Sequence, residues 1–314
     1  MSKLPPDAKG VYFISATPFT PSGSIDFAST DRLVDYYARA GVDGITILGM
    51  MGEAPKLDTE ESLAFAERVI KRAGSLPVIV GVSGPGFAAM RGLARGASEH
   101  GAAGVMIAPP ASCRTDDQIV GYYRQASTAI GADIPFVIQD YPLAYGVVMS
   151  TGVIARIVEA HPACAMLKHE DWPGLEKIST LRRLMQDGKM RRVPILCGNG
   201  GVFLDFELAR GADGAMTGYA FPELLVRLCA AQASGDTGTV RSLFDIHLPL
   251  MRYEQQPGVG LAVRKYVLHR RGLLASETQR APVIGLSKEA RAEVDALVAD
   301  VLARDTTIKF KALA

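Results

Sequence analysis

One short turn recurs along this chain and restricts what it can fold into. The turn joins the end of a helix-like segment to the start of a β-branched run, at residues 40–44, 100–104 and 210–214, and each copy carries two glycines. Glycine ends a helix because it tolerates the left-handed backbone conformation. Repetition of this turn indicates repeated βα units, whose parallel strands are covered by helices.

Eight short apolar runs are expected to be the strands of these units. They lie at residues 11–16, 44–48, 78–82, 104–108, 136–139, 165–167, 195–197 and 214–216. Segments with helical spacing separate them, for example at residues 31–40, 59–73, 88–100, 118–130 and 152–160. Eight units favour a closed (β/α)8 TIM barrel over an open sheet. No G-x-G-x-x-G follows a strand, so a dinucleotide-binding fold has no support.

After about Phe221 the strand pattern ends. Helical spacing continues at residues 224–234, 239–253, 260–271 and 288–303. The sequence therefore predicts an α/β barrel with the active site over residues 1–221, and a C-terminal helical region over residues 222–314.

The composition excludes several classes of partner and location. The 314 residues carry a net charge of +1, with basic and acidic residues interspersed, which argues against nucleic acid as a partner. No apolar run is long enough to span a membrane. The four cysteines, Cys113, Cys164, Cys197 and Cys229, are far apart, which disfavours disulfides or a zinc site. We expect a cytoplasmic protein whose thiols are reduced.

In a barrel of this kind the chemistry lies at the carboxyl ends of the strands, and polar or glycine-rich segments follow several of the expected strands there. These positions are Gly49, Met50, Met51, Gly52 and Glu53 after the second strand, Gln139 and Tyr141 after the fifth, Lys168 and Glu170 after the sixth, Asn199 after the seventh, and Met216, Thr217 and Tyr219 at the eighth.

Lys168 directly follows the apolar run at residues 165–167, so its amine is expected at the rim of an apolar interior. A neutral amine in such a place can attack a ketone and form an imine. The alternative is a lysine that pairs with Glu170 or Asp171. The loop from Gly49 to Glu53 offers backbone N–H groups that can hold a carboxylate, or it is a tight βα turn.

From Gly10 to about Leu302 the chain resembles the dihydrodipicolinate synthase/N-acetylneuraminate lyase family of pyruvate-dependent class I aldolases. The loop from Gly49 to Glu53 matches the GxxGE motif of the family, and Lys168 matches its Schiff-base lysine on the sixth strand. The resemblance implies a covalent imine with no other cofactor and a homotetramer or dimer. It also implies that the amides of Met50 and Met51 hold the carboxylate and that Met216 lines the pyruvate side of the pocket.

The sequence departs from dihydrodipicolinate synthases at the positions that perform their second step. Those enzymes have two proton-relaying threonines where this chain has Met50 and Met51, and a thioether has no proton to pass. Their tyrosine on the fifth strand is Gln139 here, and their substrate-binding arginine is Ala144. The tyrosine that a neighbouring subunit supplies falls near Ala111. Together these losses argue against lysine biosynthesis.

The pattern of Gln139 and Asp140 before Pro142 resembles the 2-oxo-3-deoxy sugar-acid dehydratase branch, which includes enzymes acting on 2-keto-3-deoxyarabonate. We therefore expect a Schiff-base-forming class I lyase that acts on a small 2-oxo acid, either a 2-keto-3-deoxy sugar-acid dehydratase or an aldolase. Two alternatives stay open: 4-hydroxy-tetrahydrodipicolinate synthase, and a non-catalytic barrel that binds a 2-oxo acid.

Roles for the remaining residues follow from their chemistry. Gln139 can orient a carbonyl, hydroxyl or water, and Tyr141 either replaces the missing hydroxyl or packs beside Pro142. Glu170 is a base or a partner of the lysine. The polar groups of Asn199, Thr217 and Tyr219 are expected to contact substrate hydroxyls.

Overall fold

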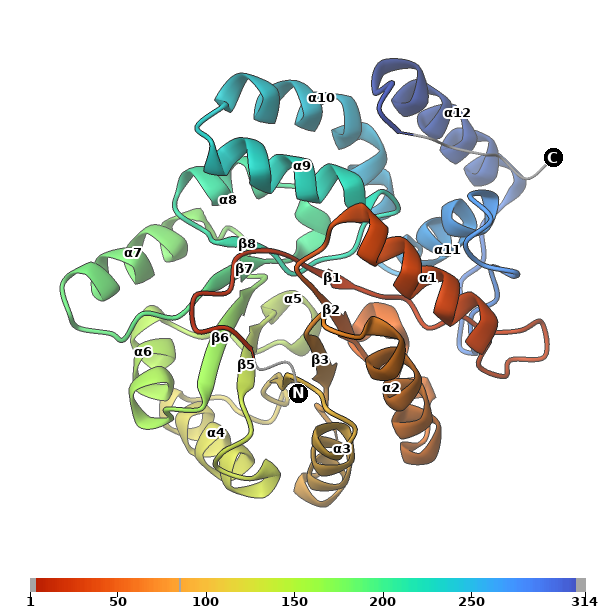
Figure 1. Ribbon diagram of the computed structural model, residues 1–314. Helices are drawn as coiled ribbons and strands as arrows, with labels where there is room; N and C mark the ends of the chain where they lie inside the picture. Colours follow the sequence, from red (N-terminus) through yellow and green to blue (C-terminus); the bar gives the residue numbers. More distant parts are fainter. Residues whose placement is uncertain (1–3, 85, 309–314) are drawn as a thin grey trace.

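Eight parallel strands form a closed barrel in the computed structural model, which describes residues 4–84 and 86–308 (Figure 1). The strands are β1 (Gly10–Ile14), β2 (Gly44–Ile47), β3 (Val78–Gly81), β4 (Gly104–Ile107), β5 (Phe136–Asp140), β6 (Cys164–His169), β7 (Ile195–Cys197) and β8 (Gly214–Ala215). They pair in sequence order, and β8 closes the barrel on β1 through Gly10 and Gly214. The predicted TIM barrel is confirmed, and all eight predicted strands are found within a few residues.

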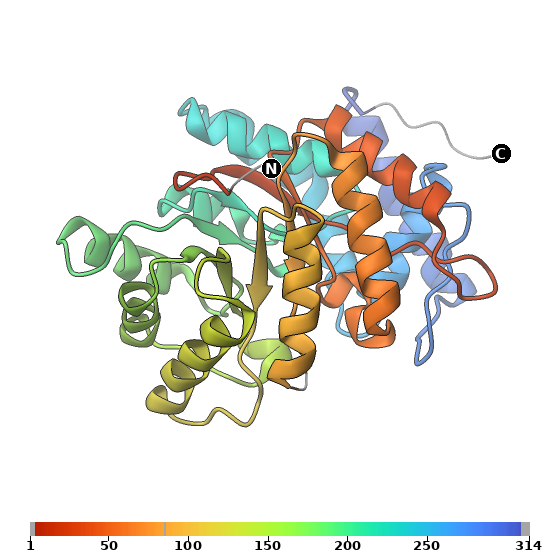
Figure 2. The ribbon, with the colours of Figure 1, turned by 60° about the horizontal axis from the view of Figure 1, so that its bottom comes forward.

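Helices separate the strands and surround the barrel (Figures 1 and 2). They are α1 (Phe27–Ala40), α2 (Thr59–Ala73), α3 (Phe87–Glu99), α4 (Asp116–Ile130), α6 (Thr151–Ala160), α7 (Leu175–Gln186), α8 (Leu204–Ala209) and α9 (Pro222–Ala233), with a short α5 (Pro142–Tyr145) after β5.

Local sequence signals fix where two of these helices begin and where one ends. Asp58 and Glu61 form a capping box at the start of α2, and Thr115 and Gln118 form one at the start of α4. Gly41 ends α1 with a φ of 81°, the left-handed conformation that its turn requires.

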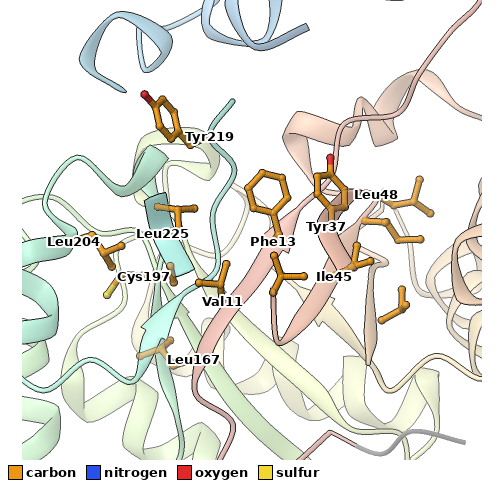
Figure 3. Packing of buried hydrophobic residues seen from close by; sticks show 14 of the residues in the cluster. Val11, Phe13, Tyr37, Ile45, Leu48, Leu167, Cys197, Leu204, Tyr219 and Leu225 are labelled. Atoms are coloured by element: carbon orange, nitrogen blue, oxygen red, sulfur yellow. The ribbon is translucent and has the colours of Figure 1, made fainter. Parts of the chain in front are cut away.

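Side chains alternate between two hydrophobic cores, as strand geometry requires. The outer core lies between strands and helices and includes Val11, Phe13 and Ile45. Figure 3 shows Phe13 beside Tyr37 in this core. The inner core fills the barrel. Its members are Leu4, Ala8, Tyr12, Ile14, Ile79, Ala103, Met106, Val137, Met166, Leu196 and Met216. The barrel is thus a packed core and not a pore.

The amino end of the barrel is closed by the start of the chain. Leu4 and Ala8 are buried in the inner core together with Ala103, which directly precedes β4. The interior is therefore filled with apolar side chains from this end upward, and polar side chains meet at the carboxyl end.

The C-terminal helices pack on one side of the barrel (Figures 1 and 2). They are α10 (Thr237–Glu254), α11 (Gly260–Arg270) and α12 (Lys288–Arg304). Helix α9 contacts β1, β8 and α10, so it lies between the barrel and these later helices. The division at residues 221 and 222 stays a prediction, and residues 309–314 lie outside the described part. Among the described helices, none combines the length and apolar character that crossing a bilayer needs.

Candidate active site

The alternation of side chains along β6 places the side chain of Lys168 inside the barrel. Met166, two residues earlier on β6, belongs to the inner core, whereas Leu167 belongs to the outer core. Lys168 therefore shares the inner face with Met166, and in the same way Gln139 shares it with Val137 on β5. Gln139 and Lys168 are also register partners. Their side chains thus lie next to each other at the carboxyl end of the barrel.

Glu170 joins these two residues. Its Oε1 lies 2.7 Å from Lys168 Nζ and accepts a hydrogen bond from Gln139 Nε2 at 2.8 Å. All three residues are buried, at 5% exposure or less. The predicted alternative that Lys168 pairs with Glu170 is thus also what the structure contains. A carboxylate bound to the lysine and to a neutral amide is placed to accept a proton from a molecule attached to that lysine.

The loop after β7 contacts Glu170 and fixes its position. Asn199 Nδ2 donates to the backbone oxygen of Glu170 at 2.9 Å, and the Asn199 backbone has a φ of 49°. A Cβ at Gly198 would stand 2.3 Å from Glu170 Cγ, so glycine leaves the space that this side chain occupies. Asn199 thereby holds Glu170.

A second polar group lies on the outer side of β5 and β6. Asp140 and His169 are both fully buried there, and Lys177 Nζ lies 2.9 Å from Asp140 Oδ2. Lys177 also pairs with Asp171 at 2.5 Å, so Asp171 is not the partner of Lys168. His169 points away from Lys168, as the alternation predicts, and fills the space beside Gly174.

Two tyrosines lie within electrostatic range of Glu170. Tyr141 follows β5, Tyr145 ends α5, and their ring centroids are 6.4 Å apart. Burial, followed by the negative charge of Glu170, raises the pKa of each hydroxyl to about 12. Both hydroxyls therefore stay protonated at neutral pH and can donate hydrogen bonds. The sequence analysis singles out Tyr141 and misses Tyr145, because it does not predict the single helical turn of α5 that brings Tyr145 beside Tyr141.

The loop after β2 presents unpaired amide groups. Its residues form one turn of 3₁₀ helix, Met50–Gly52, in which the amides of Gly52 and Glu53 bond to Gly49 and Met50. Among the described residues, the amides of Met50 and Met51 have no hydrogen-bond acceptor. The Met50 side chain is 46% exposed. The backbone of this loop can thus receive an anion, as sequence reasoning expected.

The carboxylate of Glu53 forms hydrogen bonds with residues of the C-terminal region and of its own loop. Its Oε1 accepts a hydrogen bond from Lys265 Nζ at 2.6 Å, and its Oε2 accepts from Lys56 Nζ at 2.9 Å and from the Arg280 amide at 3.0 Å. Sequence reasoning grouped Glu53 with the substrate-binding residues, and a contact with substrate stays a prediction. It missed Lys265, because a contact across 212 residues of chain leaves no local signal.

Three residues that follow β8, Met216, Thr217 and Tyr219, differ in their surroundings. Met216 is fully buried in the inner core together with Met166, and its contact with the substrate stays a prediction. Thr217 is also buried, with its methyl group near Gly201. Tyr219 belongs to the outer core (Figure 3). Its hydroxyl lies 3.0 Å from His247 Nδ1. The expectation that Tyr219 contacts substrate is therefore wrong, because its hydroxyl is already bonded outside the barrel.

A metal centre is not formed by the described residues, in which no three His, Cys, Asp or Glu side chains are grouped as ligands. The four cysteines are free, and Cys164 and Cys197 are buried.

Comparison with known proteins places this architecture in a family. A model of the Dihydrodipicolinate synthetase family matches residues 7–301. The chain is 31% identical over 301 residues to the L-2-keto-3-deoxyarabonate dehydratase of Azospirillum brasilense, covering 94% of this chain and 95% of that protein. It is 27% identical over 283 residues to the 4-hydroxy-tetrahydrodipicolinate synthase of Chlorobium chlorochromatii (strain CaD3), covering 89% and 92%.

A solved structure agrees with these relatives. The dihydrodipicolinate synthase of Rhodopseudomonas palustris has a TM-score of 0.94 and 59% identity, over 96% of this chain and 100% of that one. The expected resemblance is confirmed over nearly the whole chain. The chain belongs to the dihydrodipicolinate synthetase family and is a lyase of that family.

Proposed function

We propose that Lys168 forms an imine with a 2-keto-3-deoxy sugar acid and that the enzyme removes water from it. The observation that carries this proposal is the contact of Glu170 with both Lys168 and Gln139, at 2.7 and 2.8 Å. This arrangement supplies a base beside the imine without the hydroxyl relay that Met50 and Met51 cannot provide.

The proposed reaction begins at the lysine. Lys168 attacks the C2 ketone as the neutral amine; the hydroxyl of the resulting carbinolamine takes a proton from solvent and leaves as water, which gives a protonated imine that withdraws electrons from C3. Glu170 takes a proton from C3, and the electron pair of that bond forms an enamine. The enamine expels the C4 hydroxyl, which leaves as water once it is protonated. Hydrolysis of the resulting conjugated imine returns the lysine, so the net change is loss of one water from C3 and C4.

Three other groups would position the substrate. The amides of Met50 and Met51 would hold the C1 carboxylate, and their thioethers would keep that side of the pocket apolar. Tyr141 would donate a proton or a hydrogen bond to the departing hydroxyl, which its protonated state supports. Gln139 would keep the carboxylate of Glu170 pointed at the imine. Asn199 and Thr217 would contact the distal hydroxyls.

The dehydratase from A. brasilense supports this proposal, because it acts on a substrate of the proposed class. The R. palustris protein favours a second candidate, 4-hydroxy-tetrahydrodipicolinate synthase, because it is named for that activity and shares 59% of its residues. Against it, the loop has thioethers in place of hydroxyls, and Ala144 offers no charge for a second carboxylate. We therefore place the dehydratase first.

Borohydride trapping tests the imine. We expect pyruvate and 2-keto-3-deoxy acids to leave a reduced adduct on Lys168, located by peptide mass spectrometry, and we expect none on a Lys168→Ala variant. Absence of an adduct with every 2-oxo acid would refute the mechanism.

A substrate panel tests the reaction. Loss of water from a 2-keto-3-deoxy acid supports the dehydratase, whereas release of pyruvate and an aldehyde identifies an aldolase. Condensation of pyruvate with aspartate semialdehyde would establish the synthase instead. Adduct formation without turnover of any substrate would identify a 2-oxo-acid-binding protein.

We also propose a homo-oligomer, a tetramer or a dimer, in the cytoplasm. Membership of the family supports a homo-oligomer, and the four free cysteines support a cytoplasmic location. One family member at 25% identity is described as a monomeric variant, so sedimentation equilibrium is the deciding measurement.

A further inference from the structure

The loop that carries Met50 and Met51 has strained ends. Leu48 and Glu53, which flank it, have φ values of 56° and 55°, in the left-handed region that residues other than glycine avoid. At Gly81 on β3, a Cβ would stand 2.2 Å from the oxygen of Leu48, so the loop begins pressed against the neighbouring strand. A backbone of this kind persists only where surrounding contacts hold it.

Lys265 supplies the strongest of these contacts. It lies on α11, is fully buried, and donates from Nζ to Glu53 Oε1 at 2.6 Å and to the Thr278 backbone oxygen at 2.8 Å. The same Nζ lies 4.5 Å from the centroid of the Phe19 ring, in the loop after β1. Burial lowers the pKa of Lys265 to about 8, and the charge of Glu53 opposes this effect. Removing Glu53 would leave the buried Lys265 amine without its ion partner, whereas removing Lys265 would leave Glu53 paired with Lys56 alone.

Arg280 binds the same loop by its backbone and by its side chain. Its amide donates to Glu53 Oε2, and its guanidinium donates to the backbone oxygens of Lys56 at 2.9 Å and of Gly23 at 2.8 Å. It also pairs with Glu61 on α2. Through Arg280, the segment after α11 is thus hydrogen-bonded to the loops that follow β1 and β2.

We propose that Lys265 and Glu53 form a clamp through which α11 holds the amides of Met50 and Met51 at the spacing that the substrate carboxylate requires. Lys265 is a positioning residue that acts through Glu53 and does not touch the substrate. This proposal rests on the proposed function for the identity of the anion. It gives the C-terminal helices a role in binding the substrate, in addition to their packing on the barrel.

A Lys265→Met variant tests the clamp, because Glu53 keeps two donors, Lys56 and the Arg280 amide. The readout is the pyruvate concentration that gives half-maximal borohydride labelling of Lys168. We expect this concentration to rise about 10- to 100-fold, the scale of a displacement of about 1 Å, while the maximal labelling stays as in wild type. Glu53→Gln, which keeps the volume of the side chain, should raise the concentration for half-maximal labelling less than Lys265→Met does. The double variant should raise this concentration no further than Lys265→Met alone.

The matched control is Arg271→Met. Arg271 follows α11, its side chain is buried, and it pairs with Glu223 at 2.9 Å without contacting Glu53. We expect it to lower the melting temperature but to leave half-maximal labelling unchanged. If Lys265→Met only lowers the melting temperature in the same way, Lys265 is merely structural and the proposal is overturned.

Hydrogen exchange separates failure of the clamp from failure of the proposed function. The amides of residues 49–57 should exchange faster in Lys265→Met than in wild type or Arg271→Met, with no ligand present. This result would support the clamp even if no 2-oxo acid labelled wild-type Lys168. Unchanged exchange would overturn the clamp even if labelling of Lys168 succeeded.

Discussion

Lys168, on the inner face of β6, meets Glu170, the residue directly after that strand, with Nζ 2.7 Å from Oε1, because the two are two residues apart along the strand direction. The same oxygen accepts the amide of Gln139, so the carboxylate is fixed beside the atom that would become the imine nitrogen.

Glu170→Gln should separate imine formation from proton removal. Glutamine keeps the size of the side chain but cannot accept a proton from C3. We expect borohydride labelling of Lys168 to persist while turnover falls about 10²- to 10⁴-fold, the usual contribution of a positioned base. Asp171→Asn is the control, because Asp171 pairs with Lys177 and should leave turnover nearly unchanged. Near-normal turnover of Glu170→Gln would show that another group is the base.

Gly198→Ala should displace Glu170 without unfolding the protein. The added Cβ would stand 2.3 Å from Cγ and 2.5 Å from Oε2 of Glu170. We expect kcat to fall, with circular dichroism unchanged. Gly121→Ala on α4, where a Cβ meets nothing within 4 Å, should retain full activity. Equal activity of the two variants would contradict the placement of Glu170.

Tyr141→Phe should lower kcat without changing the pH dependence. The pKa of Tyr141 is raised to about 12, so its hydroxyl is protonated throughout the working range and acts as a donor. We expect a loss of about 10²-fold, and a pH profile between about pH 6 and about pH 10 of the same shape as wild type. Tyr145→Phe should lower kcat less than Tyr141→Phe does. Disappearance of an alkaline limb in Tyr141→Phe would mean that the hydroxyl works as a base.

Acidification should destabilise the fold through His247. Its Nε2 lies 3.1 Å from Asp305 Oδ2, and both side chains are buried together with Tyr219. Burial lowers the pKa of His247 below 6.5, so the unfolded chain takes up a proton before the folded one does, and the free energy of unfolding falls as the pH drops below about 6.5.

Asp305 acts in the same direction at lower pH. Burial opposes its ionisation, but hydrogen bonds from Thr307 and His247 and the charge of Arg227 lower its pKa overall. Its contribution to stability is present above the ordinary carboxyl pKa and is lost as the pH falls through the lowered one. Urea unfolding at a series of pH values measures both effects. In His247→Gln the loss near pH 6.5 should vanish and the loss at lower pH should remain; an unchanged pH dependence would exclude His247 as its source.

The sequence predicts the barrel well because the βα units are local. Each αβ turn and each apolar run can be recognised within a few residues, and strand alternation then decides that Lys168 faces inward and His169 outward. The same reasoning predicts the cluster of Lys168, Glu170 and Gln139, since the carboxyl ends of neighbouring parallel strands lie together.

What the sequence does not reveal depends on contacts between distant segments. Glu53 reaches Lys265 across 212 residues and Arg280 across 227, and neither contact has a signature in the local pattern. Tyr219 is misjudged for a related reason. Its place after a strand suggests the active site, but His247 on α10 provides a partner outside the barrel.

The closed amino end of the barrel has a consequence for the order of events. Leu4 and Ala8 seal that end, and apolar side chains fill the interior up to Lys168. In the proposed reaction, substrate, product and the water that is released and later consumed would therefore share the entrance that the described residues leave at the carboxyl end, above Lys168. Under this arrangement a product still in place blocks the next substrate, so the product should inhibit competitively, and anything that narrows the entrance should slow arrival and departure together.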